Sequence, residues 1–301
     1  MGKQTNASGA IDLNRLRHKA ERPLNIISLL FSLAVYVILT VLAVRALDDP
    51  EKAGQLIEFL EAEDGDSLLF QCGVFFVLVI LVVTFIKILW GFFINLGETV
   101  SCDLPVSDRQ FANLNEICSS YAGKLGLKFV PGLYISEDGQ AEAEASSVTV
   151  KSTLYIRLDC YNMLVAKDLD DYTAARFMIA SELAHIALGH RNILWVLLTL
   201  PARMLPIYKD LVFRAMNYSA DRVAAELTGA KEAIDAIIVL ANDPYMAAEI
   251  DKDAYIRDIM RSESGLHSSS RFYYNLLSDE PIPAYRIAAL SDPSKKDGRL
   301  F

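Results

Sequence analysis

Two long apolar runs stand near the start of the chain. Residues 24–44 and 68–86 contain no Asp, Glu, Lys or Arg, and each run is long enough to cross a hydrocarbon core about 30 Å thick. We therefore predict two transmembrane helices, one at 24–44 and one at 68–96 that includes a juxtamembrane extension. A cleaved signal peptide is the alternative for the first run, but its apolar part is too long and no small-residue cleavage site follows it.

The charges that flank these runs predict their orientation. The N-terminal segment 1–23 is basic, whereas the connecting loop 45–67 is strongly acidic. Short loops rich in Lys and Arg stay in the cytoplasm, so we expect 1–23 to be cytoplasmic and 45–67 to be extracytoplasmic. Two spans return the chain to the side on which it started. The sequence thus predicts an integral, multi-pass membrane protein whose main domain, 97–290, faces the cytoplasm.

A third apolar run, Ile193 to Leu198, lies inside that domain. Arg191 and Arg203 bracket this run, and Pro201 and Pro206 interrupt the apolar sequence after it, so the run is too short to span a bilayer. We expect a core or interfacial helix here rather than a re-entrant segment. An interfacial position would hold the domain close to its membrane anchor.

Along the rest of the domain, the spacing of the apolar residues changes from a helical period to alternation and then back to a helical period. Gly and Pro punctuate these segments, and Pro131 restricts the first strand to an edge or strand-entry position. The tail, 291–301, is polar enough to be loose. The pattern predicts an α+β domain that is mostly helical with a small sheet. The expected strands are 129–136 and 147–158, and the expected helices are 107–121, 171–185 with Gly189 as its C-cap, 209–228 and 231–241, the last two separated at Gly229.

Composition and net charge favour lipid as a partner and exclude nucleic acid. The chain of 301 residues is 52% apolar with a mean hydropathy of +0.26, which is too apolar for a purely soluble protein of this length and indicates contact with lipid. A net charge of −9 leaves no basic field for nucleic acid, so we exclude nucleic acid as a partner. The four cysteines form no C-x-x-C pair, so they indicate neither a disulfide framework nor a cysteine metal site.

The strongest chemical motif is Ser181-Glu182-Leu183-Ala184-His185. Zinc peptidases of the H-E-x-x-H kind place two imidazoles four residues apart on one helix face to hold the metal, and the intervening glutamate acts as general base. Here a serine stands at the first histidine position. With 16 glutamates and 4 histidines in the chain, about 0.2 E-x-x-H pairs are expected by chance. The motif alone therefore indicates a core helix with one polar pair.

Several segments, in order, resemble the HtpX-like and CAAX-prenyl-protease type of membrane zinc metallopeptidases. The resemblance covers about 104–290 and implies a zincin-like fold of the gluzincin type. It rests on 181–190 (SELAHIALGH, beside the family's HELAHIALGH-like helix), on 217–222 (NYSADR, beside E-x-x-A-D-R), on Glu280-Pro281 with Arg286 (beside H-P and a later arginine), and on the "LGLKFVPGLYI" core of 104–158.

The resemblance also implies roles for individual residues. Glu182 stands at the general-base position, and Asp221 and Arg286 match the family's retained polar partners. His185 is the one ligand residue that is kept, because Ser181 and Asn217 stand at the other two zinc-ligand positions. Glu280 replaces the C-terminal histidine, and 141–147 (AEAEASS) replaces the family's N-A-F edge-strand segment.

These substitutions predict a protein that has lost its metal. Serine and asparagine are weak neutral ligands, and one histidine does not hold catalytic zinc. We therefore expect no cofactor and a pseudoprotease that binds or regulates a protein or extended-peptide partner in its cleft, in addition to membrane lipid. The alternative is an active zinc-dependent membrane endopeptidase with an altered metal site.

Without a metal, the remaining polar groups predict local contacts. Glu182 and His185 are three residues apart on a helix and can pair. Asp221 can accept a hydrogen bond from the imidazole, and Ser181 and Asn217 can bond to each other in place of the lost ligands.

The other candidate groups receive structural interpretations. His190 lies just past a helix end, His267 is expected to be exposed, and His18 belongs to the basic juxtamembrane segment. Ser181 as a nucleophile beside His185 is disfavoured because no oxyanion hole can be named. No phosphate-binding glycine loop and no G-x-S-x-G elbow occur in the sequence.

Overall fold

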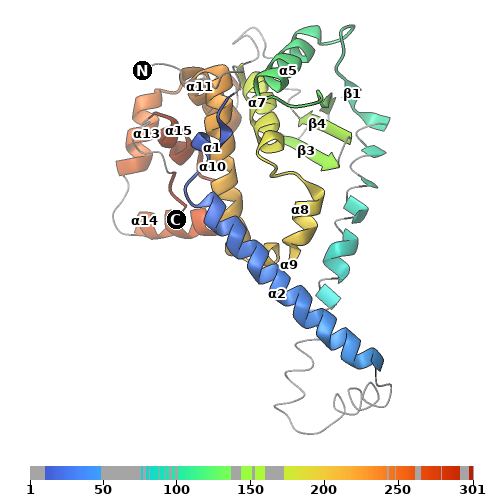
Figure 1. Cartoon of the computed structure of the whole chain (residues 1–301). Coiled ribbons are helices and arrows are strands. Elements are labelled where there is room, and N and C mark those ends of the chain that lie inside the picture. The colour runs from blue at the N-terminus through green and yellow to red at the C-terminus, as the bar shows by residue number, and fades with distance from the viewer. Residues whose placement is uncertain are drawn as a thin grey trace.

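The fold of the chain was taken from a computed structural model. The described part is mostly helical and contains one small sheet (Figure 1), as the sequence pattern predicts. The structure describes residues 11–48, 101–136, 144–150, 153–159, 173–242, 244–247, 249–261, 266–278, 280–291 and 298–300, together with separate positions between 76 and 98.

The sheet has four strands in the order β1-β2-β4-β3. β2 and β4 are parallel, and the other two neighbouring pairs are antiparallel. Pro131 directly precedes β2, which confirms its strand-entry position. The single strand expected at 147–158 is wrong, because this stretch belongs to two antiparallel strands, β3 and β4. The strands are β1 (Leu104–Pro105), β2 (Gly132–Ser136), β3 (Glu144–Val150) and β4 (Thr153–Asp159).

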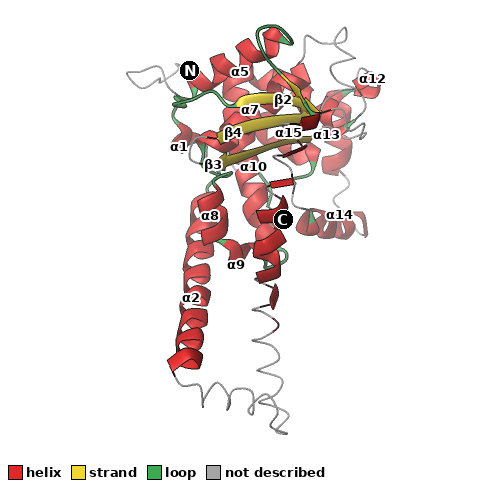
Figure 2. Ribbon diagram, turned by 90° about the vertical axis from the view of Figure 1, so that its right-hand side faces the viewer, coloured by secondary structure: helices red, strands yellow, loops and turns green. Residues whose placement is uncertain are grey.

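Most of the helices lie on one side of the sheet, and α2, α8 and α9 extend below it (Figures 1 and 2). The described helices are α1 (Leu13–Leu16), α2 (Glu21–Asp48), α5 (Ala112–Lys124), α7 (Thr173–Ala187), α8 (Ile193–Leu198), α9 (Leu200–Arg203), α10 (Tyr208–Thr228), α11 (Ala230–Ala241), α12 (Pro244–Ala247), α13 (Lys252–Arg261), α14 (Leu266–Leu277) and α15 (Pro283–Ser291).

Helix α7 is the centre of the domain. It packs against α10 and α11 on one side and against α5, β3 and β4 on the other, and most of its residues are buried. Small side chains such as Ala180, Ala184 and Ala220 are fully buried and allow the neighbouring helices to approach closely. A helix that is buried all round places its few polar residues inside the domain. This is why the S-E-L-A-H motif ends up in the interior.

Two glycines end helices as predicted. Gly189 has φ +80 just after α7, and Gly229 has φ +107 between α10 and α11, a conformation that glycine adopts without strain. The predicted start of the first domain helix at Ser107 is wrong. Ser107 and Gln110 pair with each other in a turn, and Phe111 has φ 56, so α5 begins at Ala112.

Among the described residues, one helix is long and apolar enough to cross a membrane: the stretch Glu21–Val41 of α2. Figures 1 and 2 show that α2 leaves the domain and projects well beyond it. The loop predicted at 45–67 and the second span predicted at 68–96 lie largely outside the described residues. The described positions of 76–98 are helical.

Both ends of the described chain pack against the domain. Ile11, Leu13 and Leu16 lie on its hydrophobic core. At the other end, the Tyr218 hydroxyl donates a hydrogen bond of 3.0 Å to the carbonyl of Arg299. The expectation of a loose tail is therefore wrong for residues 298–300, because a buried tyrosine gives this polar segment a specific partner.

Candidate functional site

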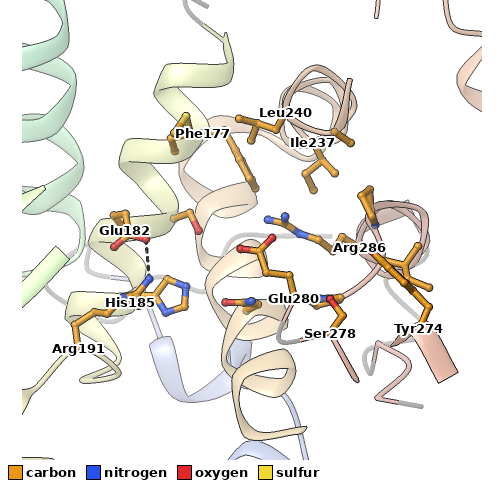
Figure 3. A pocket seen from close by; sticks show the side chains of 17 residues that line it. Phe177, Glu182, His185, Arg191, Ile237, Leu240, Tyr274, Ser278, Glu280 and Arg286 are labelled. Carbon is orange, nitrogen blue, oxygen red and sulfur yellow. Dashed lines mark hydrogen bonds and ion pairs between the residues drawn. The ribbon is translucent and has the colours of Figure 1, made fainter. Parts of the chain in front are cut away.

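A cavity of about 640 Å³ lies between α7, α10, α11, α14 and α15 (Figure 3). The structure places in its wall six of the residues that the sequence singled out: Ser181, Glu182 and His185 from α7, Asn217 from α10, Glu280 from the segment before α15, and Arg286 from α15. Phe177, Met178, Ile237, Leu240, Pro281 and Ile282 supply apolar wall. The cavity thus combines an apolar lining with several hydrogen-bonding groups.

Glu182 is buried and is held by a cation. Nη2 of Arg191, in the turn after α7, donates to Oε1 of Glu182 over 3.1 Å. The expected pair between Glu182 and His185 is therefore replaced by an ion pair with Arg191. The contact with Arg191 holds the Glu182 side chain in one orientation.

His185 continues into a chain of buried polar groups. Its Nδ1 lies 2.9 Å from Nδ1 of His190, and Nε2 of His190 lies 3.1 Å from Oε1 of Glu21. Burial, followed by the nearby Arg191, lowers the pKa of His185 well below its ordinary value. Burial and the nearby Arg17 lower the pKa of His190 in the same way. Both imidazoles are neutral at pH 7.

The tautomers of the two imidazoles follow from this network. The Glu21 carboxylate only accepts hydrogen bonds, so Nε2–H of His190 donates to it. Nδ1 of His190 is then an acceptor and receives the Nδ1–H of His185. The lone pair of His185 is left on Nε2. Histidine ligands in metal sites are oriented by the same kind of chain, in which the second nitrogen donates to a fixed acceptor.

Glu21 lies at the start of the apolar helix α2 and is completely buried. Arg17 and the Ser219 hydroxyl also donate to its carboxylate. Arg17 additionally donates to the carbonyl of Leu188 over 2.9 Å, and the backbone N–H of His18 donates to Ser219 Oγ over 2.8 Å. The first turn of α2 is thereby joined to α7 and α10 at the level of the cavity.

Sequence reasoning does not find this chain of groups. His190 lies just past a helix end, as expected, but it is buried and bonded on both ring nitrogens. The signal in the sequence is Glu21 itself, because a carboxylate at the start of an apolar helix needs a hydrogen-bonding partner wherever it is buried. His18 is also buried, with its ring stacked on Tyr218 at 5.7 Å between ring centroids.

Asp221 and Arg286 form a bidentate ion pair. Nε and Nη2 of Arg286 donate to the two carboxylate oxygens of Asp221 over 2.8 and 2.7 Å. Burial opposes the charge of Arg286, but the Asp221 carboxylate outweighs it and raises the pKa of the guanidinium. The expectation that Asp221 accepts from the imidazole is wrong, since Arg286 takes both of its oxygens. In Figure 3 Glu280 lies beside Arg286 and adds to the attraction.

Ser181 and Asn217 both line the cavity. Within the described residues no direct hydrogen bond joins the two side chains, so the expected mutual contact is not formed. Each has its hydrogen-bonding capacity available to a molecule in the cavity.

The donor set of this cavity does not fit zinc. At the positions expected for zinc ligands the cavity offers one imidazole, one neutral hydroxyl and one neutral amide. The wall also holds two carboxylates, but Glu182 is bound to Arg191 and Glu280 interacts with Arg286. In the described ranges no group of three or more His, Cys, Asp and Glu side chains could hold a metal ion. These donors therefore give no support for zinc chemistry, and the expected lack of a cofactor stays a prediction.

Two further candidates are only partly described. Residues 141–143 of the segment that replaces N-A-F lie outside the described residues, and 144–147 belong to β3. His267 is in α14, but its side chain is not among those described.

Comparison of the chain with protein-family models, with curated proteins and with solved structures gives no match.

Proposed function

We propose that the chain is a membrane-anchored protein with an HtpX-like metallopeptidase fold that binds a polypeptide without cleaving it. One observation carries this proposal. The positions that would hold zinc and its base meet in one cavity, but they present Ser181, Asn217 and a Glu182 bound to Arg191.

The chemistry of these residues argues against hydrolysis. A catalytic zinc lowers the pKa of its bound water and polarises the scissile carbonyl. Ser181 and Asn217 are poor replacements for an imidazole and a carboxylate as ligands. With no activated water at this point, Glu182 has no proton to remove, and its ion pair with Arg191 makes it a fixed polar feature of the wall.

The same wall is suited to an extended peptide. A volume of about 640 Å³ lies within the range of about 300–1,000 Å³ that is usual for ligand pockets. Ser181 and Asn217 can bond to peptide N–H and C=O groups, while Phe177 and Ile237 can contact apolar side chains. β3 is at the edge of the sheet and packs against α7. A sheet edge beside the same helix offers backbone groups for strand addition.

The anchor supports action at a membrane. Helix α2 is long and apolar enough to cross a bilayer, and the basic residues before it favour a cytoplasmic position for the domain. A second span at 68–96 would make the protein multi-pass. The partner would then be a membrane protein or a chain that reaches the membrane surface.

Metal content and peptide binding test the proposal together. Full-length protein purified without chelator should contain far less than one zinc per chain and should not cleave casein. Fluorescein-labelled casein, used as an extended polypeptide, should bind and remain intact. Ser181→Trp should abolish binding by filling the cavity, whereas Lys231→Ala on the exposed face of α11 is the matched control.

Three outcomes contradict the proposal. Stoichiometric zinc with metal-dependent cleavage of casein would establish the endopeptidase alternative. Casein binding that is equal in the Ser181→Trp and control variants would place the peptide elsewhere. Failure of the double variant Ser181→His, Asn217→Glu to gain zinc binding while it stays folded would remove the inferred ligand positions.

A further inference from the structure

The segment 193–207 runs alongside the membrane helix α2. The hydroxyl of Tyr36 on α2 donates to the carbonyl of Leu197 over 2.6 Å. The backbone N–H of Ala202 donates to Oγ of Ser32 over 3.2 Å. Tyr208, at the start of α10, donates to the carbonyl of Leu24 over 2.7 Å. The segment therefore descends along α2 as far as Tyr36 and returns to the level of Leu24.

These contacts give the depth of the segment. No charged residue occurs in α2 between Arg22 and Arg45, a stretch of 22 residues or about 33 Å at 1.5 Å per residue. Ser32 and Tyr36 are about 15 and 21 Å from Arg22 along the helix by the same rise. Both lie near the middle of a hydrocarbon core about 30 Å thick. If α2 spans the bilayer, the α8–α9 turn lies at that depth too.

Polar residues of α2 provide hydrogen-bond partners for backbone groups of this turn that have no partner within α8 or α9. Ser28, Ser32 and Tyr36 are four residues apart and share one face of an otherwise apolar helix. The Leu197 carbonyl lies at the end of α8, and the Ala202 N–H lies in the first turn of α9, where helices have unsatisfied groups. Ser32 and Tyr36 satisfy these two groups. In hydrocarbon no water would do so, and each would cost several kcal/mol.

The side chains of the segment are suited to lipid. Helix α8 has no buried residue, and Leu194 is 71% exposed. The one charged residue between 193 and 207 is Arg203. Its Nε donates to Thr199 Oγ1 over 2.9 Å, and its guanidinium lies over the ring of Phe213. In water these exposed apolar side chains would be unfavourable, whereas acyl chains would cover them without cost.

We infer that residues 193–207 form a re-entrant hairpin that enters the hydrocarbon beside α2, with lipid acyl chains as its partner. This rests on the membrane anchor of the proposed function. It reverses the expectation of a core or interfacial helix, because the contacts with α2 place the turn deep rather than at the surface. Arg191, at the start of the hairpin, also binds Glu182. The start of the hairpin is therefore joined directly to the wall of the cavity.

Tryptophan fluorescence tests the depth directly. The chain has two tryptophans, Trp90 and Trp195, so Trp90→Phe leaves Trp195 of α8 as the only one. In vesicles of full-length protein, Trp195 should emit at short wavelength. A nitroxide on the lipid acyl chain should quench it more strongly than a nitroxide on the headgroup or aqueous iodide. Stronger quenching by iodide or by the headgroup nitroxide would overturn the hairpin.

Cysteine labelling separates the hairpin from the anchor. In a variant whose exposed native cysteines are serine, Leu194→Cys and Val37→Cys should resist a membrane-impermeant maleimide until detergent is added. Glu226→Cys, on the exposed part of α10, is the labelled control. Labelling at position 194 with protection at 37 would overturn the hairpin and leave the anchor intact. Labelling at both positions would overturn the anchor as well.

Discussion

Replacement of Glu21 by Gln tests the connection between α2 and the cavity. The change keeps the shape of the side chain and removes its charge. Glu21 is completely buried and accepts from Arg17, His190 and Ser219. Removing one member of a buried ion pair typically costs about 3–5 kcal/mol, because the other charge is left buried and unpaired.

Two contacts in the structure place the cost of Glu21→Gln at the lower end of this range. The Arg17 side chain is 21% exposed and also donates to the carbonyl of Leu188, so part of its charge stays solvated. The Ser219 hydroxyl can turn and donate to the carbonyl of Ala215 instead. We therefore expect Glu21→Gln to lower the free energy of unfolding by about 3 kcal/mol. Ser219→Ala removes two hydrogen bonds but no charge, the one donated to Glu21 and the one accepted from the His18 N–H, and should cost about 2 kcal/mol.

Denaturant unfolding of the full-length protein in detergent micelles, followed by circular dichroism, measures these differences. The double variant Arg17→Met, Glu21→Gln removes both charges and should cost less than the sum of its single variants. In the double variant Ser181→His, Asn217→Glu, adding Glu21→Gln should also weaken zinc binding by roughly 10–100-fold, because a neutral amide oxygen is a weaker acceptor for His190 Nε2–H than a carboxylate. A loss in Glu21→Gln no larger than that of Ser219→Ala would refute the buried network.

Three more predictions concern contacts outside the cavity's ligand positions. Asp221→Ala should cost about 3–5 kcal/mol of unfolding free energy, and adding Arg286→Met should restore much of it; additive costs in a double-mutant cycle would argue against the bidentate pair. Gly298→Ala should cost about 1–3 kcal/mol, because an added Cβ meets the buried Tyr218 ring, and an unchanged melting temperature would show that the tail does not pack there. Burial lowers the pKa of His18 from 6.5 to about 4. The unfolded chain therefore takes up this proton first, and the stability that His18 contributes above pH 6.5 should be lost as the pH falls toward about 4. His18→Gln should flatten that part of a melting-temperature profile, and an equally steep profile in the variant would contradict this assignment.

Local features of the chain could be predicted because they depend on neighbouring residues. A run of apolar residues is enough to predict α2, since every backbone group of a helix is satisfied within the run itself. Gly189 and Gly229 end helices because only glycine adopts positive φ without strain. The period of the sequence also indicated a mostly helical domain with a small sheet. It did not distinguish one strand at 147–158 from the hairpin β3–β4, because alternation continues through both strands.

The candidate site was only partly accessible from sequence. The positions of Ser181, His185 and Asn217 in one cavity were expected from a resemblance, and the structure brings them together. Their partners were not predicted correctly. Asp221 binds Arg286 rather than the imidazole, and Glu182 binds Arg191. Both choices depend on where a flexible arginine can reach, which the spacing of residues along one helix does not specify.

The sequence by itself determined the long apolar helix and the helix ends at Gly189 and Gly229. Only the tertiary structure decided which buried polar groups of distant segments bind each other. Glu21 and His190 are 169 residues apart, and His18 and Ser219 are 201 residues apart. The placement of residues 193–207 beside α2 likewise depends on hydrogen bonds to Ser32 and Tyr36. Periodicity describes which face of an element is apolar, but the partner of each buried polar group is chosen by packing between distant elements.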